Sequence, residues 1–238
     1  MSGHSHFKTI KAQKELADAK RGKIFSKLSR LITIAAKEGE NPDFNPKLKA
    51  AIEQAKQFNM PKENIERAIK KGTGELEGEK LQEILFEGFG PGGVAIIIEG
   101  ITDNVNRTLN EIKMIFNQFN GKLAGEGAVK WMFDRKGIIS ASCQNKPKDE
   151  IELAIIEAGA EDFYWENESI EIYTKPEELE KIKKNLQEKN FKIESAALGY
   201  KAKEEVDVLP KEREQIQKLF EALGENDAVN EIYSNLKV

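Results

Sequence analysis

The sequence predicts an α+β multidomain protein, with a basic domain of three helices followed by two small α/β domains, the third inserted into the second. Apolar residues recur at helical spacing through the first 75 residues. The pattern then changes to short strands that alternate with helices, and part of the middle domain is completed only at the C-terminus. The predicted boundaries are 1–78 for the helical domain, 79–135 with 203–238 for the middle domain, and 136–202 for the inserted domain.

Three amphipathic helices are expected in the first domain. The first starts at Lys23 and ends at Gly39, and one of its faces is apolar, formed by Ile24, Leu28, Leu31 and Ala35. Asn45 caps the second helix, with Pro46 in its first position. The third runs from 61 to 72, where a glycine is expected to stop it. The polar, glycine-rich stretch "GTGELEGEK" that follows is predicted to be a linker.

The middle domain begins with two strands, 85–89 and 94–99, that "GPGG" joins into a hairpin. A helix over 105–119 follows "TDN", and "VKWMFD" is predicted to be the third strand. The C-terminal helix 211–223 and strand 229–233 are expected to complete this domain. The alternative is that they form a free helix–strand hairpin.

Residues 136–202 form a set of elements complete in itself. The expected order is strand, helix, strand, strand, helix, strand, over 137–143, 147–158, 162–166, 169–174, 176–188 and 192–198. This order is typical of a ferredoxin-like module. With the middle domain built from similar elements, we expect two small ferredoxin-like α/β domains.

The charge of the chain is unevenly distributed, although its formal net charge is only −4. Counting gives 16 Lys or Arg against 9 Asp or Glu in residues 1–75, a net of +7, which leaves −11 for the remainder. A basic end on an acidic body indicates an anionic partner. A solvated surface helix is the alternative explanation.

Two groups of basic residues are candidates for contact with nucleic acid. On a helical wheel, Lys20, Lys23, Lys27 and Arg30 fall within an arc of roughly 80°, beside the apolar face, while Arg21 points elsewhere. Upstream, Lys8, Lys11 and Lys14 recur every three residues and suggest a basic arm. Lysine neutralises phosphate as a point charge, whereas arginine reads guanine better. The pattern therefore favours binding over sequence specificity.

Other chemistry finds little support in the sequence. Gly88–Gly93 matches G-x-G-x-x-G, but a strand follows where a dinucleotide site needs a helix, so we expect a hairpin. His4 and His6 are the only histidines, and Cys143 is the only cysteine. We therefore predict no catalytic residues, no metal and no cofactor. No apolar run is long enough to span a membrane, and the lone cysteine suits a reducing compartment, so a cytoplasmic location is expected.

Several segments together resemble one known family. They are "GHSHFKTIK", "DAKRGKIFSKLSRLITIAAK", "NPKLKAAIEQAKQFNMPKENIERAIKKGTGELEG", "FEGFGPGGVAIIIE", "TDNVNRT" and "WMFDRKG". The sequence resembles the YebC/PmpR family of probable transcriptional regulators, to which the mitochondrial translational activator of cytochrome c oxidase also belongs. The resemblance covers nearly the whole chain and is densest from 3 to 137.

The resemblance implies three domains, no enzyme activity and no small-molecule substrate. It implies DNA binding and control of transcription, with binding to ribosomal RNA as a translation factor as the alternative. Two positions depart from the family pattern: "GHSKW" reads His4-Ser5-His6-Phe7, and the arginine of "TDNRNRT" is Val105. The oligomeric state is not indicated by the sequence.

Overall fold

The computed structural model describes residues 18–143, 147–166 and 169–237, with only the backbone described for 18–20 and 166. The chain forms two compact units. One contains Met132–Glu205 and the residues from Asn235 on, and the other contains the chain up to Trp131 together with Val206–Ser234. Three helices come first, and further helices then alternate with the strands of two antiparallel sheets, so the α+β multidomain prediction is confirmed.

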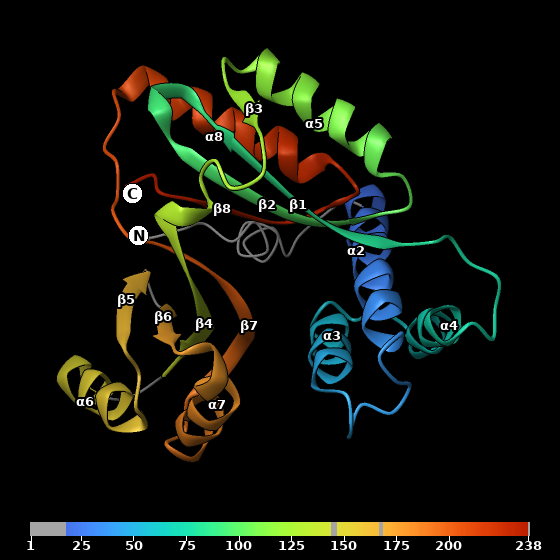
Figure 1. Ribbon diagram of the computed structural model, residues 1–238. Helices are drawn as coiled ribbons and strands as arrows, with labels where there is room; N and C mark the ends of the chain where they lie inside the picture. The colour runs from blue at the N-terminus through green and yellow to red at the C-terminus, as the bar shows by residue number, and fades with distance from the viewer. Residues whose placement is uncertain (1–17, 144–146, 167–168, 238) are drawn as a thin grey trace. The chain divides into compact units, whose positions relative to one another are not determined.

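The larger unit begins with the three helices α2 (Asp18–Ala36), α3 (Pro46–Gln57) and α4 (Lys62–Thr73), labelled in Figure 1. Both α3 and α4 pack on α2. Their shared core consists of buried aliphatic residues, namely Leu28, Ile32, Ala35, Ala36, Leu48, Ala51, Ala55, Met60, Ile65 and Ala68. The amphipathic spacing seen in the sequence therefore becomes one small core.

The helix ends follow local chemistry. The Asn45 side chain accepts the backbone N–H of Leu48 at 3.0 Å and donates to the carbonyls of Ala35 and Gly39, both at 2.8 Å. Two predicted ends need correction. Helix α2 is already helical at Asp18, the first described residue, and so before Lys23, and α4 passes through Gly72 to end at Thr73, capped by Gly74, whose φ of 84° is left-handed.

The same unit contains a four-stranded antiparallel sheet in the order β3-β1-β2-β8. Its strands are β1 (Gln82–Phe89), β2 (Ala95–Thr102), β3 (Lys122–Ala124) and β8 (Val229–Ser234). Helices α5 (Val105–Gln118) and α8 (Pro210–Glu225) lie on one face (Figure 1). Gly88 lies against Phe116 of α5 and Gly90 lies near Leu219 of α8. The C-terminal strand β8 pairs with β2 and is not part of a free hairpin.

The predicted third strand "VKWMFD" is wrong. The strand after α5 is Lys122–Ala124, whereas Lys130–Met132 form a short 3-10 turn, η2, and β4 starts at Phe133. The reason is a side chain: Glu87 accepts backbone N–H groups from the 125–131 segment, so this backbone bonds to a carboxylate rather than to a strand.

The other unit has the predicted β-α-β-β-α-β order and a sheet in the order β5-β6-β4-β7. Its elements are β4 (Phe133–Ser142), α6 (Lys148–Ala158), β5 (Asp162–Glu166), β6 (Ser169–Thr174), η3 (Pro176–Glu178), α7 (Leu179–Glu188) and β7 (Lys192–Ala202). Aliphatic residues of both helices and the central strands form its core, including Ile139, Ile155, Ile172, Ile182 and Leu186.

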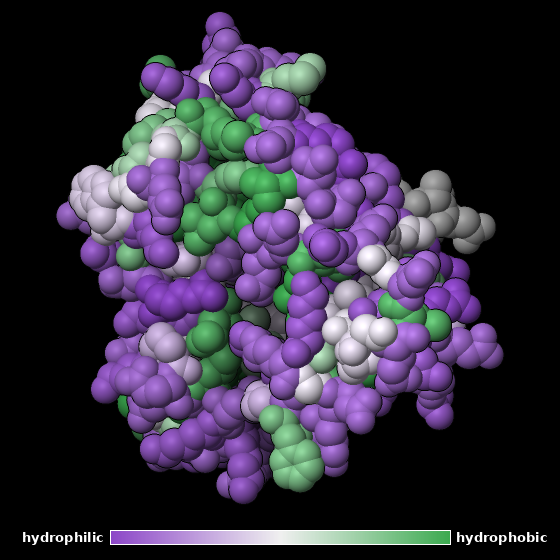
Figure 2. Space-filling view, turned by 45° about the vertical axis from the view of Figure 1, so that its right-hand side comes forward, coloured by the Kyte–Doolittle hydropathy of each residue, from purple (hydrophilic) through white to green (hydrophobic). Residues whose placement is uncertain are grey.

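The molecular surface is strongly polar. The face shown in Figure 2 is covered mainly by hydrophilic residues, in keeping with a chain in which 33% of residues are charged. Functional contacts are therefore sought in the placement of particular charges and of the few exposed large apolar side chains.

Candidate nucleic-acid interface

The structure separates the predicted basic residues into three groups. Lys8, Lys11 and Lys14 lie outside the described residues. Lys20 is in the first turn of α2, and Arg21 follows it with an exposed side chain. The remaining three residues, Lys23, Lys27 and Arg30, come together on one side of α2 and all face the C-terminal end of α8.

These three cations make hydrogen bonds within the unit. The Lys27 ammonium donates to the Gly224 carbonyl at 2.7 Å, and the Arg30 guanidinium donates to the Asp227 carbonyl at 3.0 Å. The Lys23 ammonium contacts the Glu225 carboxylate at 2.6 Å. A helix C-terminus has carbonyls without helical partners and carries partial negative charge, so cations are favoured there. We call Lys20, Lys23, Lys27 and Arg30 the basic stripe. Its last three residues fasten α2 to α8.

Burial separates Lys27 from its neighbours. Its residue is only 7% exposed, and loss of hydration lowers the pKa of Lys27 to about 8, although Asp227, Glu225 and Glu231 oppose that shift. The pKa of Lys23 is instead raised, first by its hydrogen bond to Glu225. The expectation that the whole stripe lies exposed beside the apolar face is therefore wrong for Lys27. Lys27 and Gly224 are 197 positions apart, so no local sequence pattern could predict their contact.

A polar cleft lies beside this contact. It has a volume of about 380 Å³, and its lining comprises Lys23, Arg30, Thr102, Arg107, Thr108, Glu111, Glu225, Asn226, Asp227 and Ala228. Its charges pair locally, since Arg107 contacts Asp103 at 2.6 Å and the Asn226 amide donates to Glu111 at 2.9 Å. Three cations and three carboxylates line the wall, so the cleft offers no concentrated positive charge to an anion.

Exposed basic residues occur elsewhere on the helical domain. Those whose side chains make neither an ion pair nor a hydrogen bond with another described residue are Lys49, Lys56, Arg67, Lys70, Lys71 and Lys80. Arg67, Lys70 and Lys71 lie on the outer side of the last turns of α4, and we call them the α4 basic face. Lysines at a helix C-terminus also stabilise the helix itself, so Lys70 and Lys71 have a structural role as well.

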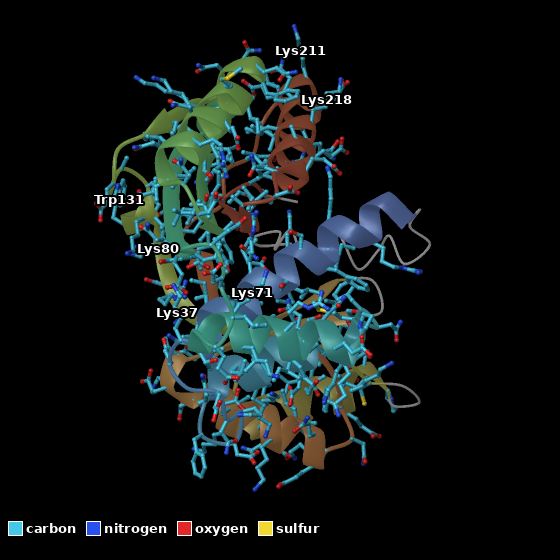
Figure 3. All side chains as sticks on the ribbon, turned by 90° about the vertical axis from the view of Figure 1, so that its right-hand side faces the viewer. Lys37, Lys71, Lys80, Trp131, Lys211 and Lys218 are labelled. Atoms are coloured by element: carbon cyan, nitrogen blue, oxygen red, sulfur yellow. The ribbon has the colours of Figure 1, made fainter. Side chains whose placement is uncertain are left out.

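Two further lysines lie at the same end of the helical domain as the α4 basic face. Lys37 follows α2, and its ammonium donates to the Leu81 carbonyl at 2.7 Å, next to Lys80. A Cβ placed on Gly78 would lie 3.5 Å from the Lys71 side chain, so the linker returns past α4. Figure 3 shows Lys37, Lys71 and Lys80 on this part of the unit. Glu75, Glu77 and Glu79 accompany them and reduce the local net charge.

Close contact between helices fixes the position of this face. The Thr33 hydroxyl of α2 donates to the Ala68 carbonyl of α4 at 3.1 Å. At Gly72 the two helices are so close that a Cβ would lie 2.4 Å from the Thr33 carbonyl oxygen and 2.6 Å from the Ala36 Cβ. Gly72, predicted as a stop, instead permits this crossing, and the α4 basic face is held rigidly on the outside.

A second feature is the loop that Glu87 organises. Its carboxylate is 2% exposed and accepts the backbone N–H groups of Gly127, Val129 and Lys130 at 2.7, 2.7 and 2.8 Å. Burial alone would raise the pKa of Glu87, but the three N–H donors together outweigh it, so the pKa lies below its usual value. Trp131 ends this loop and is 67% exposed.

The described residues lack a cluster typical of a metalloenzyme site. In that part of the chain, no group of three or more His, Cys, Asp or Glu side chains is placed to hold a metal ion. His4 and His6 lie outside it. Gly88–Gly93 forms the turn between β1 and β2, closed by a Gly90 N–H to Val94 carbonyl bond of 2.8 Å, and leads into no helix. Nor does any described helix combine the length and the apolar character needed to cross a membrane.

Sequence comparisons decide the family. Residues 5–75 match the family model of the TACO1/YebC protein N-terminal domain, and residues 81–236 match that of the TACO1/YebC second and third domain. The chain belongs to the TACO1/YebC family. The predicted resemblance is thereby confirmed.

Members of the TACO1/YebC family match this chain over its full length. A probable transcriptional regulatory protein of Thermoanaerobacter pseudethanolicus is 46% identical, covering 100% of this chain and 98% of that protein. Another from Thermotoga maritima is 47% identical, with 100% and 94% covered. The crystal structure of a conserved hypothetical protein from Aquifex aeolicus is similar with a TM-score of 0.87 and 45% identity, over 92% of this chain and 91% of that one.

Proposed function

We propose that this TACO1/YebC protein is a non-enzymatic, cytoplasmic regulator that binds nucleic acid. The ligand that we assign first is DNA, and the process that it regulates is then transcription. The relatives' names support a regulatory role. The observation that carries the nucleic-acid part is the α4 basic face, which is exposed and makes no ion pair within the described chain. Such cations gain affinity for a phosphate backbone by releasing counterions.

The geometry favours contact with the backbone over reading of bases. The α4 basic face contains two lysines and one arginine, and α3 and α4 each pack on α2. A recognition helix that reads the major groove usually presents Arg, Asn or Gln to base edges. Lysines position a protein on phosphates and carry little sequence information.

The hydrogen bonds of the basic stripe to the end of α8 favour other residues for the phosphate contacts. Lys23, Lys27 and Arg30 hold α2 on α8, so we assign the phosphate contacts first to the α4 basic face. Lys8, Lys11, Lys14, Lys20 and Arg21 remain predicted contacts at the start of the chain. Together with the α4 basic face, these residues would place the contact on the helical domain. The remainder of the chain is acidic and would be repelled by the polyanion.

Ribosomal RNA is the second candidate ligand, which would make the protein a translation factor. The lysine-rich contact surface favours it, because structured RNA is recognised by shape and backbone more than by base edges in a groove. The test is to crosslink nucleic acid to the protein in cells, purify it under denaturing conditions and sequence what is attached. Enrichment of particular DNA regions supports the first assignment, and enrichment of ribosomal RNA supports the second. Recovery no higher than with an unrelated acidic protein would overturn both.

A further inference from the structure

Trp131 is an exposed aromatic side chain that the structural roles described so far leave unexplained. Its residue is 67% exposed, although tryptophan normally buries a large apolar area in a fold. In Figure 3 the labelled side chain lies at the margin of its unit. An isolated exposed aromatic needs a further observation before it indicates a ligand, and the loop around Trp131 provides one.

The indole is held in place by its own loop. Its Nε1–H donates to the Ala128 carbonyl at 3.0 Å, so the polar edge of the ring is already satisfied. The backbone on either side is fixed by Glu87, which accepts N–H groups from Gly127, Val129 and Lys130. What the indole still offers to a ligand is therefore its apolar face, and an ordered loop presents that face at little entropic cost.

One buried side chain fixes this loop. A carboxylate is buried at Glu87 and is compensated by three hydrogen bonds to a single loop. A tryptophan needed only for packing would be turned towards the sheet. A fixed ring turned outwards is understandable if its position matters to a partner.

The neighbouring charges favour one class of partner. Lys130 precedes the tryptophan, and Lys122 stands on the edge strand β3 beside the loop; both are exposed and make no ion pair with a described residue. Glu126 is the acid of the same loop. Proteins bind single-stranded nucleic acid with such a combination of exposed aromatic and lysine side chains, where bases stack on the ring and cations meet phosphates.

We propose that Trp131 is a stacking platform for an unpaired nucleobase, and that Glu87 is the positioning residue that holds it. This inference rests on the proposed function and specifies its ligand as single-stranded DNA or RNA. A base within a duplex is already stacked on both sides, so the platform discriminates between paired and unpaired strands. Stacking is tolerant of sequence, in agreement with a contact surface poor in base-reading side chains.

The experiment measures binding of the full chain to a fluorescent 15-nucleotide single strand, to the duplex of the same sequence and to a single strand with abasic sites. Trp131→Ala should weaken binding to the intact single strand by about 5- to 150-fold. Its binding to the duplex and to the abasic strand should change less than twofold. Trp131→Phe keeps an aromatic face and should recover most of the affinity. Met114→Ala is the matched control, because it removes another large exposed side chain, 72% exposed, from α5.

Intrinsic fluorescence supplies a second readout. The chain has two tryptophans, so Trp165→Phe leaves Trp131 as the only one, and the single strand should quench it. Glu87→Gln should weaken single-strand binding while duplex binding persists. Equal binding by wild type and Trp131→Ala, without quenching, would overturn the platform and leave the proposed function standing. Absence of binding to every nucleic acid would overturn both, and Trp131-dependent capture of a protein instead of a single strand would replace the platform by a protein interface.

Discussion

The buried Lys27 makes a prediction about stability that follows from the contact between α2 and α8. The perturbation is Lys27→Met, which keeps most of the side-chain volume and removes the titrating ammonium. In the native state the Lys27 pKa is about 8, and the usual value is 10.5. The native state therefore releases this proton at lower pH than the unfolded chain does.

The sign follows from proton linkage. Between about pH 8 and pH 10.5 the unfolded chain binds more protons at this site, so the free energy of unfolding of the wild type rises with pH. Below pH 8 the cost of burying the charge is fully present. A difference of about 2.5 between the two pKa values corresponds to at most about 3 kcal/mol at 1.36 kcal/mol each. The stability of wild type relative to Lys27→Met should therefore increase by up to that amount between pH 7.5 and 10.5.

Two assays check this prediction. Urea unfolding followed by Trp131 fluorescence in a Trp165→Phe background reports on the unit that contains Lys27. Carbon-13 NMR of the lysine Cε atoms reads the titration of Lys27 directly, with Lys23, whose pKa is raised, as an internal reference.

A matched variant and one clear outcome make the test decisive. Lys49→Met removes an exposed lysine of α3 and should change stability by no more than about 0.5 kcal/mol. A Lys27 titration midpoint near 10.5, together with a stability difference that does not vary with pH, would refute the reasoning. It would mean that the Lys27 ammonium is hydrated in solution and that α2 is not fastened to Gly224 of α8.

Two further predictions concern the loop and the helix crossing. Glu87→Gln should lower the free energy of unfolding at pH 7 by about 1–3 kcal/mol, because a neutral amide replaces a carboxylate that accepts three N–H bonds. Since the Glu87 pKa is depressed, its stabilisation is present above the usual value of 4.5 and is lost as the pH falls through the native value, so the gap between variant and wild type should close in acid. Gly72→Ala should lower Tm through a cost of about 1–3 kcal/mol, because its Cβ would lie 2.4 Å from the Thr33 carbonyl. Gly22→Ala, in a helix with nothing within 4 Å, should instead raise Tm; an equal response of the two glycines would contradict the close crossing.

Local patterns predicted most of the secondary structure. The capping of α3 by Asn45, the hairpin at Gly88–Gly93 and the β-α-β-β-α-β order of the second unit follow from spacing and turn residues, which act over a few positions. The failures have a common cause. "VKWMFD" has the apolar alternation of a strand. The carboxylate of Glu87, about 40 residues earlier, accepts the backbone N–H groups around its start, so they cannot pair with a strand.

The sequence predicted that the helical domain is basic, but not which of its cations are exposed. Net charge pointed to the helical domain, because an excess of cations is visible without any structure, and contact of this domain with nucleic acid stays a prediction. Which cations are exposed depends on tertiary contacts, and the stripe at Lys23, Lys27 and Arg30 meets carbonyls about 200 residues away. The α4 basic face and Trp131 were not singled out, although Arg67, Lys70 and Lys71 on the outer side of an amphipathic helix were a visible signal.

The central claim is that the helical domain contacts nucleic acid through the α4 basic face, and the dependence of binding on salt tests it most directly. The variant is Arg67→Gln, Lys70→Gln and Lys71→Gln together. Its control removes the same charge from exposed lysines of α5 and α8, through Lys113→Gln, Lys211→Gln and Lys218→Gln. If all three residues meet phosphates, the slope of log affinity against log salt should become shallower by about 2.7 on duplex and about 2 on a single strand. The control should keep the wild-type slope. A slope unchanged in the α4 variant, or changed equally in the control, would contradict the claim.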